Sequence, residues 1–342
     1  MYTIECNNVS EGFYLAVDTF RNSQKVKENR FHTRNGWVTE LSNPCCVIYN
    51  NPTERVLFYP ERDANPFFHL MESLWMLRGR NDVKWISWFN KRMLTYSDNG
   101  DTLHGAYGHR WKHWFGKDQL EIIAKRLTTY ENDRRCVLTM WDPEVDLLES
   151  NQNVDLPCNT QIFFKKRKNI LDMTVMNRSN DLIWGCFGAN VVHMSFLLEY
   201  MCAKTNSGMG KYYQITNNLH AYEEEFKKVK DIQPEYDPYV TRLSKDSTRY
   251  VSWPLVDNMA TFDQELEYFI SASEDKDSKS LGKRIKQDFK NSFFWEVAEP
   301  LYLSWLLWKN KSWHEAVHNA QNCRDKAWAM AAVEWLFRRE PK

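Results

Sequence analysis

Cys158 has the surroundings in this sequence that most directly suggest covalent chemistry. It lies in the segment LPCNT, residues 156–160, directly ahead of a stretch expected to form a β-strand. A proline before a strand restricts the backbone and holds the following residue in a defined position. Arg134, Arg135 and Arg178 lie on or beside other expected strands, and positive charge close to a thiol favours the nucleophilic thiolate. A single cysteine is more often an apolar core residue, so neighbouring motifs must decide its role.

Three further groups of polar residues could bind a substrate or transfer a proton. The segment NRSND at 177–181 combines residues that can hold a phosphate or a sugar, although the same residues suit a capped loop. His220 and Tyr222 form a pair near an expected strand end. Glu72 lies within an apolar helical stretch, where a carboxylate must be paired, exposed on a polar face or kept for proton transfer.

The charge and composition of the chain argue against several classes of protein. Among its 342 residues, 45 basic side chains balance 45 acidic ones, which does not suit a nucleic-acid partner or a general polyanion binder. We expect any bound phosphate to be held by a few placed arginines. Because no apolar run reaches membrane-spanning length and residues 1–10 are polar, we expect no membrane partner and a cytoplasmic location.

The eight cysteines are scattered along the chain without a CxxC pair. This spacing argues against a zinc site or a redox motif, and we expect no metal. In a reducing cytoplasm the cysteines should be free thiols. Most of them should therefore behave as small buried apolar residues.

The elements that must position these residues mix helices and strands without strict alternation, which indicates an α+β fold. Strands are expected at 134–141, 160–166, 170–176 and 211–217, with a turn at 167–169. Helices are expected at 66–90, with Pro66 in the first turn and Gly79 near a stop, at 188–204 and at 219–230. Residues 272–284 are polar and precede an aromatic, helical tail at 285–339. We therefore expect a main domain at 1–271, followed at 272–342 by a polar loop and a helical extension.

Seven segments, taken in order, carry a resemblance to a known family. They are ESLWMLRG at 72–79, HGAYGHRW at 104–111, DRRCVLTMWDP at 133–143, LPCNT at 156–160, NRSNDLIWG at 177–185, GAN at 188–190 and LHAY at 219–222. In this order and spacing they resemble the thymidylate synthase family, from about Arg34 to about Ile270. The resemblance implies a mixed sheet with packed helices, a pyrimidine nucleotide substrate, methylenetetrahydrofolate as carbon donor, and a homodimer with shared active sites.

The resemblance also implies a role for each matching residue. Cys158 would be the nucleophile that adds to C6 of the pyrimidine ring and makes C5 a carbon nucleophile. The other residues matched to catalysis are Glu72, which organises water and proton transfer, Tyr107, near the thiol, and Asp181. Those matched to the nucleotide are Arg34, Arg134, Arg135, Arg178 and Ser179 for the phosphate, Asn190 for the base, and His220 and Tyr222 for the sugar. In the family pattern Asp181 and Gly185 lie around the folate, and Arg134 and Arg135 reach the phosphate of the neighbouring subunit.

Three departures from the family pattern bear on the reaction. Asn159 stands where the synthases have a histidine after the cysteine. The spacing from Gly185 to Asn190 is one residue longer than in ordinary synthases, so Ala189 stands in the strict register of the base-reading asparagine. The short apolar tail that closes a synthase is absent, and the chain continues to Lys342.

These departures bear on what becomes of the methylene group that is transferred to the ring. Hydride from the folate would give a methyl product, whereas water would give a hydroxymethyl product. Asn159 and the missing tail favour water, while Trp85 and Trp88 resemble ring walls of the synthases and favour hydride. We therefore expect hydroxymethylation of dUMP, with thymidylate synthesis as the alternative.

Two further alternatives stay open. An asparagine suits the N3–H and O4 of uracil, but the shifted register keeps a dCMP or CMP hydroxymethylase among the alternatives. A catalytically inactive protein that binds nucleotide or folate is the alternative outside the enzymes. The joint presence of Cys158, Glu72, Tyr107 and Arg178 argues against it.

Overall fold

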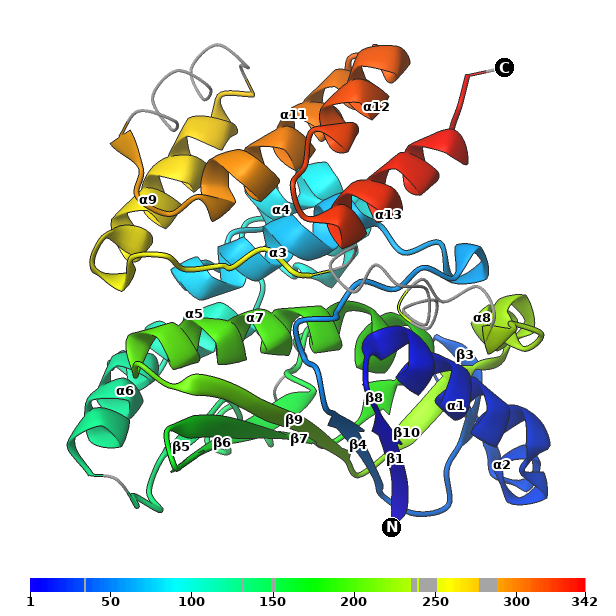
Figure 1. Cartoon of the computed structure of the whole chain (residues 1–342). Helices are drawn as coiled ribbons and strands as arrows, with labels where there is room; N and C mark the ends of the chain where they lie inside the picture. Colours follow the sequence, from blue (N-terminus) through cyan, green and yellow to red (C-terminus); the bar gives the residue numbers. More distant parts are fainter. Residues whose placement is uncertain are drawn as a thin grey trace. The chain divides into compact units, whose positions relative to one another are not determined.

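The structure is a computed structural model that describes residues 1–33, 35–130, 132–148, 150, 152–234, 239, 251–276 and 288–341. Contacts divide the chain into two compact units (Figure 1). The sheet unit comprises Met1–Ala64 and His104–Thr241. The helical unit comprises Asn65–Leu103 and Arg242–Lys342.

A six-stranded mixed sheet forms the centre of the sheet unit, in the order β1-β4-β9-β7-β6-β5. Its strands are β1 (Tyr2–Cys6), β4 (Cys45–Tyr49), β5 (Val137–Thr139), β6 (Asn159–Arg167), β7 (Ile170–Asn177) and β9 (Gly208–Thr216). The pairs β1–β4 and β7–β9 are parallel and the other pairs are antiparallel. The predicted turn at 167–169 joins β6 to β7, with positive φ at Lys168 and Asn169 as a tight hairpin turn requires.

The predicted strand at 134–141 is shorter than expected, because β5 contains only Val137–Thr139. Arg134 and Arg135 lie in the loop ahead of it rather than in the strand. The carboxylate of Asp133 accepts a hydrogen bond of 2.7 Å from the backbone N–H of Arg135, which turns the chain before the strand can begin. The strands predicted at 160–166, 170–176 and 211–217 are confirmed.

A second, four-stranded sheet has the order β2-β3-β10-β8. Its strands are β2 (Arg30–Thr33), β3 (Gly36–Glu40), β8 (Asn180–Asp181) and β10 (Leu219–Tyr222). The prediction of a helix over 219–230 is wrong for its first four residues, which form β10. Pairing with β3 on one side and β8 on the other satisfies their backbone, and helix α8 (Glu223–Val229) begins only afterwards.

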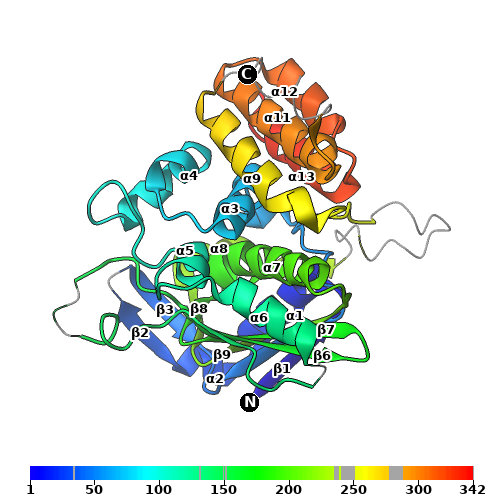
Figure 2. The same ribbon diagram turned by 90° about the vertical axis from the view of Figure 1, so that its left-hand side faces the viewer.

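Helices cover one face of the six-stranded sheet. They are α1 (Val9–Asn22), α5 (Tyr107–Lys112), α6 (Gln119–Thr129) and α7 (Asn190–Lys204), whereas α2 (Gln24–Glu28) packs on β3 of the four-stranded sheet and a 3-10 turn lies at Pro60–Arg62. Helix α7 packs on β7 and β9, and α1 packs on β1 and β4. Figures 1 and 2 show α7 along this inner face, while no described helix lies over the opposite, outer face of β5, β6 and β7.

The helix predicted at 188–204 begins earlier in the structure, because a π-helix at Leu182–Ala189 runs directly into α7. The segment Leu182–Lys204 is long and apolar enough to span a membrane. However, 83% of its apolar window is buried inside the protein. It is therefore a core helix whose apolar surface is used in packing on the sheet.

The helical unit is built around α3 (Pro66–Arg78), of whose residues Pro66 to Leu77 are all buried. The other helices are α4 (Val83–Phe89), a 3-10 helix at Lys91–Tyr96, α9 (Met259–Glu274), a π-helix at Phe294–Ala298, α11 (Glu299–Lys309), α12 (Trp313–Gln321) and α13 (Lys326–Phe337). The predicted helix at 66–90 is two helices. Gly79, with φ of 81°, ends α3, and the side chain of Asp82 caps α4.

The helical tail predicted at 285–339 is confirmed for its described part, while most of the predicted loop at 272–284 lies outside the described residues. The division into units differs from the expected boundary after residue 271. A helix that is buried on all sides needs partners all round, and α3 finds them in α4, α9, α11 and α13. Residues 65–103 therefore group with the C-terminal helices rather than with the sheet.

Candidate active site

Cys158 lies directly before β6 and is clamped by Arg178 at the end of β7. The backbone N–H of Arg178 donates to the carbonyl of Cys158 at 2.9 Å. The guanidinium donates to the carbonyls of Pro157 at 3.0 Å and Leu156 at 3.3 Å. Its Nη2 lies 3.9 Å from the Cys158 sulfur. The predicted association of thiol and arginine is therefore present, with the arginine fixed by the segment that carries the thiol.

Two opposing effects act on the Cys158 thiol. Burial raises its pKa, and the positive charge of Arg178 lowers it. The negative charges of Asp155 and Asp181 raise the pKa further. Arg178 is thus the group that favours the thiolate at this position.

The other seven cysteines differ from Cys158 in exposure. All of them are buried, whereas Cys158 is partly exposed. Burial raises the pKa of Cys45 and of Cys202 to about 12. Cys158 is therefore the cysteine that a substrate can reach, as predicted from its motif.

Tyr107 begins helix α5 and faces the thiol. Burial raises the pKa of its hydroxyl, and the charge of Cys158 acts in the same direction. Hydrogen bonds from the backbone of Asn159 and Cys158 oppose this effect. The phenol therefore stays protonated at neutral pH, as a hydrogen-bond donor beside the nucleophile.

A buried ion pair that the sequence analysis did not identify holds this part of the site together. The two terminal guanidinium nitrogens of Arg110, Nη1 and Nη2, donate to the Asp146 carboxylate, at 2.6 and 2.9 Å, and neither side chain is exposed. His104 Nε2 lies 2.8 Å from the same carboxylate. Arg110 also donates to the Met140 carbonyl at 2.6 Å. The pair ties helix α5, and with it Tyr107, to the segment that follows β5.

Ser179, His220 and Tyr222 lie together where β8 pairs with β10. The amide oxygen of Asn218 accepts hydrogen bonds from the Ser179 hydroxyl at 3.2 Å and from Nδ1 of His220 at 2.9 Å. Burial lowers the pKa of His220, which favours the neutral ring. Because Nδ1 carries the proton, Nε2 is left as an acceptor for a hydroxyl group. The Tyr222 ring packs edge-on against His220, with 5.5 Å between centroids.

Asp181 caps the π-helix that follows it. Its carboxylate accepts hydrogen bonds from the backbone N–H groups of Trp184 at 2.7 Å and Ile183 at 3.3 Å. Burial raises its pKa, while the neighbouring His220 and these backbone donors lower it. The capping bonds place the carboxylate at the junction between β8 and the π-helix.

Gly185 and Asn190 meet at Asn180. The side-chain amide of Asn190 donates to Oδ1 of Asn180 at 3.0 Å, and both residues are buried. A side chain at position 185 would collide with this oxygen. Glycine is therefore required at 185 for the two asparagines to meet, and the structure brings these predicted residues into one contact.

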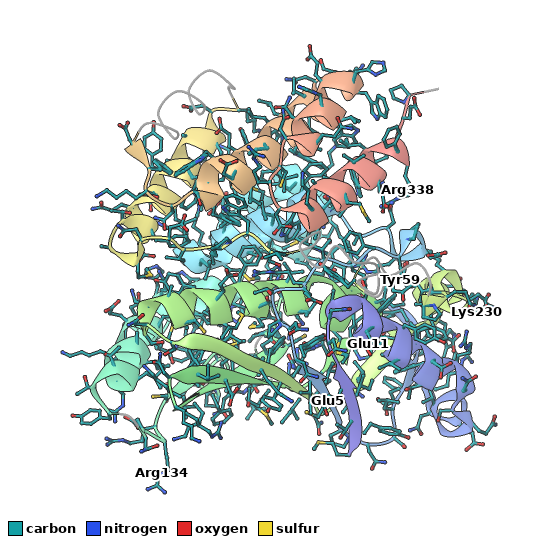
Figure 3. The ribbon with its side chains drawn as sticks, viewed as in Figure 1. Glu5, Glu11, Tyr59, Arg134, Lys230 and Arg338 are labelled. Carbon is teal, nitrogen blue, oxygen red and sulfur yellow. The ribbon has the colours of Figure 1, made fainter. Side chains whose placement is uncertain are left out.

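Arg134 and Arg135 lie apart from this cluster, on a loop ahead of β5. Arg134 points away from the ribbon in Figure 3, and the Arg135 side chain is 76% exposed. The two arginines line a pocket of about 530 Å³ with Tyr130, Asn132 and Asp133. Neither arginine takes part in the hydrogen bonds that join Arg178 to the segment carrying Cys158.

The remaining predicted residues are placed as follows. Arg34 lies outside the described residues. Glu72 is buried on α3 of the helical unit. Trp85 is buried in the same unit, where its indole N–H donates to Ser273 at 2.9 Å. Among the residues that the structure describes, no group of three or more histidine, cysteine or acidic side chains could hold a metal ion.

A pocket of about 550 Å³ opens on the outer side of the clamp. It is lined by Thr139, Trp141, Pro143, Thr160, Gln161 and Arg178. The guanidinium of Arg178 lies over the Trp141 ring, 5.6 Å from its centroid. Arg178 thus contributes both to the thiol clamp and to the wall of this pocket.

Comparisons with known proteins identify a family and several relatives. The family described as thymidylate synthase matches residues 61–250. The chain is 42% identical over 326 residues to a deoxyuridylate hydroxymethyltransferase of Pseudomonas phage M6, an alignment that covers 91% of this chain and 88% of that protein. It is 36% identical over 226 residues to the enzyme of the same name from Bacillus phage SP01, covering 63% and 59%. It is 25% identical over 238 residues to a putative thymidylate synthase of Methanothermobacter marburgensis, covering 68% and 97%.

Proposed function

The chain belongs to the thymidylate synthase family and is a one-carbon transferase, and from this premise we propose that it hydroxymethylates dUMP at C5. The observation that carries the proposal is the similarity to the phage M6 deoxyuridylate hydroxymethyltransferase over almost the whole chain. The putative synthase of M. marburgensis is more distant, at 25% identity over 68% of the chain. The family uses methylenetetrahydrofolate as its co-substrate, and we propose it as the carbon donor here.

The clamped thiol supports the first step of the reaction. We propose that the Cys158 thiolate adds to C6 of the uracil ring, with Arg178 supplying the positive charge that lowers the thiol pKa. The addition makes C5 nucleophilic, so that it can take the one-carbon unit from the folate. The protonated Tyr107 hydroxyl beside the thiol can donate a hydrogen bond during this step.

The second cluster suits nucleotide and folate binding. We propose that Arg178 and Ser179 bind the phosphate, together with Arg34. His220, with Nε2 free to accept, and Tyr222 would bind the sugar hydroxyl. Asp181 and Gly185 would lie around the folate. Arginine suits the phosphate because its planar fork of donors matches phosphate oxygens.

Asn190 and Glu72 complete the proposal. The amide of Asn190 offers the donor and the acceptor that O4 and N3–H of uracil need. Its contact with Asn180 holds that amide in a defined orientation. Glu72 would organise water and transfer protons, a role that its burial in an apolar helix suits. Both substrates are small cytoplasmic molecules, and we propose that the enzyme works in the cytoplasm.

Water, rather than hydride, would complete the product. After one-carbon transfer, the ring carries an exocyclic methylene that is electrophilic. A water oxygen adding to this carbon gives the hydroxymethyl group, and the folate leaves without oxidation. Reduction of the same carbon by the folate would give dTMP and dihydrofolate, which is the alternative reaction of the family.

The test is to run the reaction in oxygen-18 water with dUMP, dCMP or CMP and methylenetetrahydrofolate. We expect dUMP to give a hydroxymethyl nucleotide that carries the label, with no rise in dihydrofolate absorbance. An unlabelled methyl product formed in step with dihydrofolate would identify a thymidylate synthase instead. Binding of dUMP without turnover or a covalent adduct would identify an inactive binding protein.

We also propose a homodimer that forms through the outer face of the six-stranded sheet. Register places Val137, Phe163, Thr174, Tyr213 and Ile48 in one row across five strands of this face. Val137 and Phe163 are 39% and 38% exposed in the single chain. A sheet face with an apolar row is commonly covered by another protein surface, and a twofold axis would cover it with its own copy.

A further inference from the structure

A row of polar side chains crosses the inner face of the six-stranded sheet next to the nucleophile. Asn159 on β6, Asn177 on β7 and Thr216 on β9 are register partners on three neighbouring strands. They are 1%, 3% and 1% exposed. Asn159 directly follows Cys158, and Asn177 directly precedes Arg178. This polar row therefore begins at the same strand ends as the clamped thiol.

Four polar atoms of the polar row have no hydrogen-bond partner among the described residues. They are both side-chain atoms of Asn159, Oδ1 of Asn177 and Oγ1 of Thr216. Nδ2 of Asn177 donates to the Ile215 carbonyl at 3.2 Å, which leaves its Oδ1 for another partner. Buried polar groups are almost always satisfied, either by protein or by ordered water. Four such atoms on adjacent strands therefore indicate a binding site.

The four atoms determine which kind of molecule the polar row can hold. The Asn159 nitrogen only donates, the two amide oxygens only accept, and the Thr216 hydroxyl can do both. None of the three side chains is charged, so the row cannot neutralise the charge of an ion. Neighbouring strands lie about 4.8 Å apart, which limits the space between their side chains. Water is the small molecule that supplies both donors and acceptors at this scale.

We propose that Asn159, Asn177 and Thr216 bind water beside Cys158, and that this row supplies the water consumed in hydroxymethylation. The role of the polar row in supplying water rests on the proposed function. It identifies where water, the second co-substrate of that reaction, would bind. Asn159 is also the residue that departs from the synthase pattern, where a histidine follows the cysteine. The substitution thus coincides with the member of the row that has two unpartnered atoms.

The chemical step needs no further reactant. The water oxygen bonds to the exocyclic methylene carbon, and the π electrons of that methylene move onto the ring to form an enolate. The enolate restores the C5–C6 double bond as the C6–S bond breaks and the Cys158 thiolate leaves. The proton lost by the water passes to a carboxylate or to solvent. Side chains held in a sheet position a reactant more rigidly than a loop would.

The test uses a thiol that competes with water for the methylene carbon. Wild-type enzyme, Thr216→Val and Asn159→Leu are incubated with dUMP, methylenetetrahydrofolate and a fixed concentration of 2-mercaptoethanol. The ratio of thioether to hydroxymethyl nucleotide is then measured by mass spectrometry. Both products come from the same intermediate, so this ratio does not depend on the fraction of folded enzyme. Thr19→Val is the control, because its hydroxyl is hydrogen-bonded within α1, to the Leu15 carbonyl at 2.8 Å.

We expect each variant of the polar row to raise the ratio of thioether to hydroxymethyl product about fivefold, because each removes a hydrogen bond to the water. Thr19→Val should leave the ratio unchanged. An unchanged ratio in Thr216→Val and Asn159→Leu, with a hydroxymethyl product from wild-type enzyme, would overturn the supply role alone. A methyl product with dihydrofolate from wild-type enzyme would overturn the proposed function, and the supply role with it.

A crystal structure of the wild-type protein tests the site independently of the product. We expect ordered water density within hydrogen-bonding distance of Asn159, Asn177 and Thr216. In crystals of Asn159→Leu the density should be lost or displaced. Well-ordered side chains with no water between them would overturn the site, whichever product the enzyme makes.

Discussion

The arginines assigned to the phosphate occupy two regions that differ in how far a single chain prepares them. Arg178 is held by the carbonyls of Leu156 and Pro157 and lies 3.9 Å from the thiol. Arg135 is 76% exposed on a loop, where its guanidinium lies 3.6 Å from Asp133. An ion pair whose arginine is exposed contributes little to holding that long side chain in place.

The difference indicates a division of labour between the two regions. Arg178 can act on the thiol of its own chain before any substrate binds, because its bonds are already made. Arg134 and Arg135 can bind the phosphate at an active site only if another chain supplies the rest of that site. This interpretation agrees with the proposed homodimer, in which the two regions would share one active site.

The largest expected effect is that of Cys158→Ser, which should lower turnover about a thousandfold or more, since a serine hydroxyl is a far weaker nucleophile at neutral pH. Nucleotide binding should be largely retained because the arginines remain. The matched control is Cys136→Ser, which changes a buried thiol outside the clamp. Incubation with 5-fluoro-dUMP and the folate should leave a covalent adduct on the peptide that contains Cys158. An adduct on Cys136 or Cys186 would contradict the assignment.

Arg178→Gln should lower kcat/KM by about 100-fold, because a charged contact is lost at the thiol and at the phosphate. It should also shift the pH dependence. The positive charge of Arg178 lowers the Cys158 pKa, so its removal raises that pKa and reduces the thiolate fraction at a given pH. The rising limb of the kcat/KM profile should therefore move to higher pH.

Arg135→Gln is the comparison for this shift. It removes the same positive charge, but from the exposed loop, where Arg135 has no described contact with the Cys158 thiol. Activity should fall through weaker phosphate binding, with the rising limb of the pH profile in its wild-type position. If Arg135→Gln moved the limb as far as Arg178→Gln does, the two regions would not differ in the way described.

Mixing two impaired variants tests the shared site. Cys158→Ser and Arg135→Gln dimers, dissociated and reassociated in equal amounts, should regain up to about a quarter of wild-type activity, since half of the dimers are hybrids and one site in each hybrid is intact. Activity of the mixture is compared with that of each variant alone. A protein that sedimented as a monomer at assay concentration would contradict the proposal, as would a mixture no more active than its components.

Local chemistry made much of the fold predictable. The hairpin turn at 167–169 contains Asn169, a residue type that tolerates positive φ, and apolar Leu171, Met173 and Val175 recur at every second position of the strand that follows. The segment LHAYEEEF carries no local signal against a helix, so β10 was predicted as helical. Only pairing with β3 and β8, which are remote in sequence, makes residues 219–222 a strand.

The candidate site shows the same limit. The motifs correctly placed Arg178 beside the Cys158 thiol, because Cys158 directly precedes β6 and Arg178 directly follows β7, its antiparallel neighbour. The ion pair between Arg110 and Asp146 was missed, because its members lie 36 residues apart and Asp146 belongs to none of the seven recognised segments. The unpartnered atoms of the polar row could not be predicted either, since they depend on strand register. The sequence identifies the chemical groups, whereas the pairing register of the strands decides which of these groups come into contact.

The smallest expected effect concerns the base. Asn190→Asp should shift the preference from dUMP toward dCMP about tenfold, because an acceptor replaces the donor at the base edge. The ratio of kcat/KM for the two nucleotides measures the shift. In the native structure Asn190 donates to Oδ1 of Asn180 at 3.0 Å, and an aspartate would place two acceptors together. Nδ2 of Asn180 is buried without a described partner, so rotation of its amide would offer that donor to the new carboxylate. The double variant Asn190→Asp, Asn180→Ala removes this compensation and should fold less stably than Asn190→Asp alone. An unchanged preference in the single variant would mean that a group other than Asn190 reads the base.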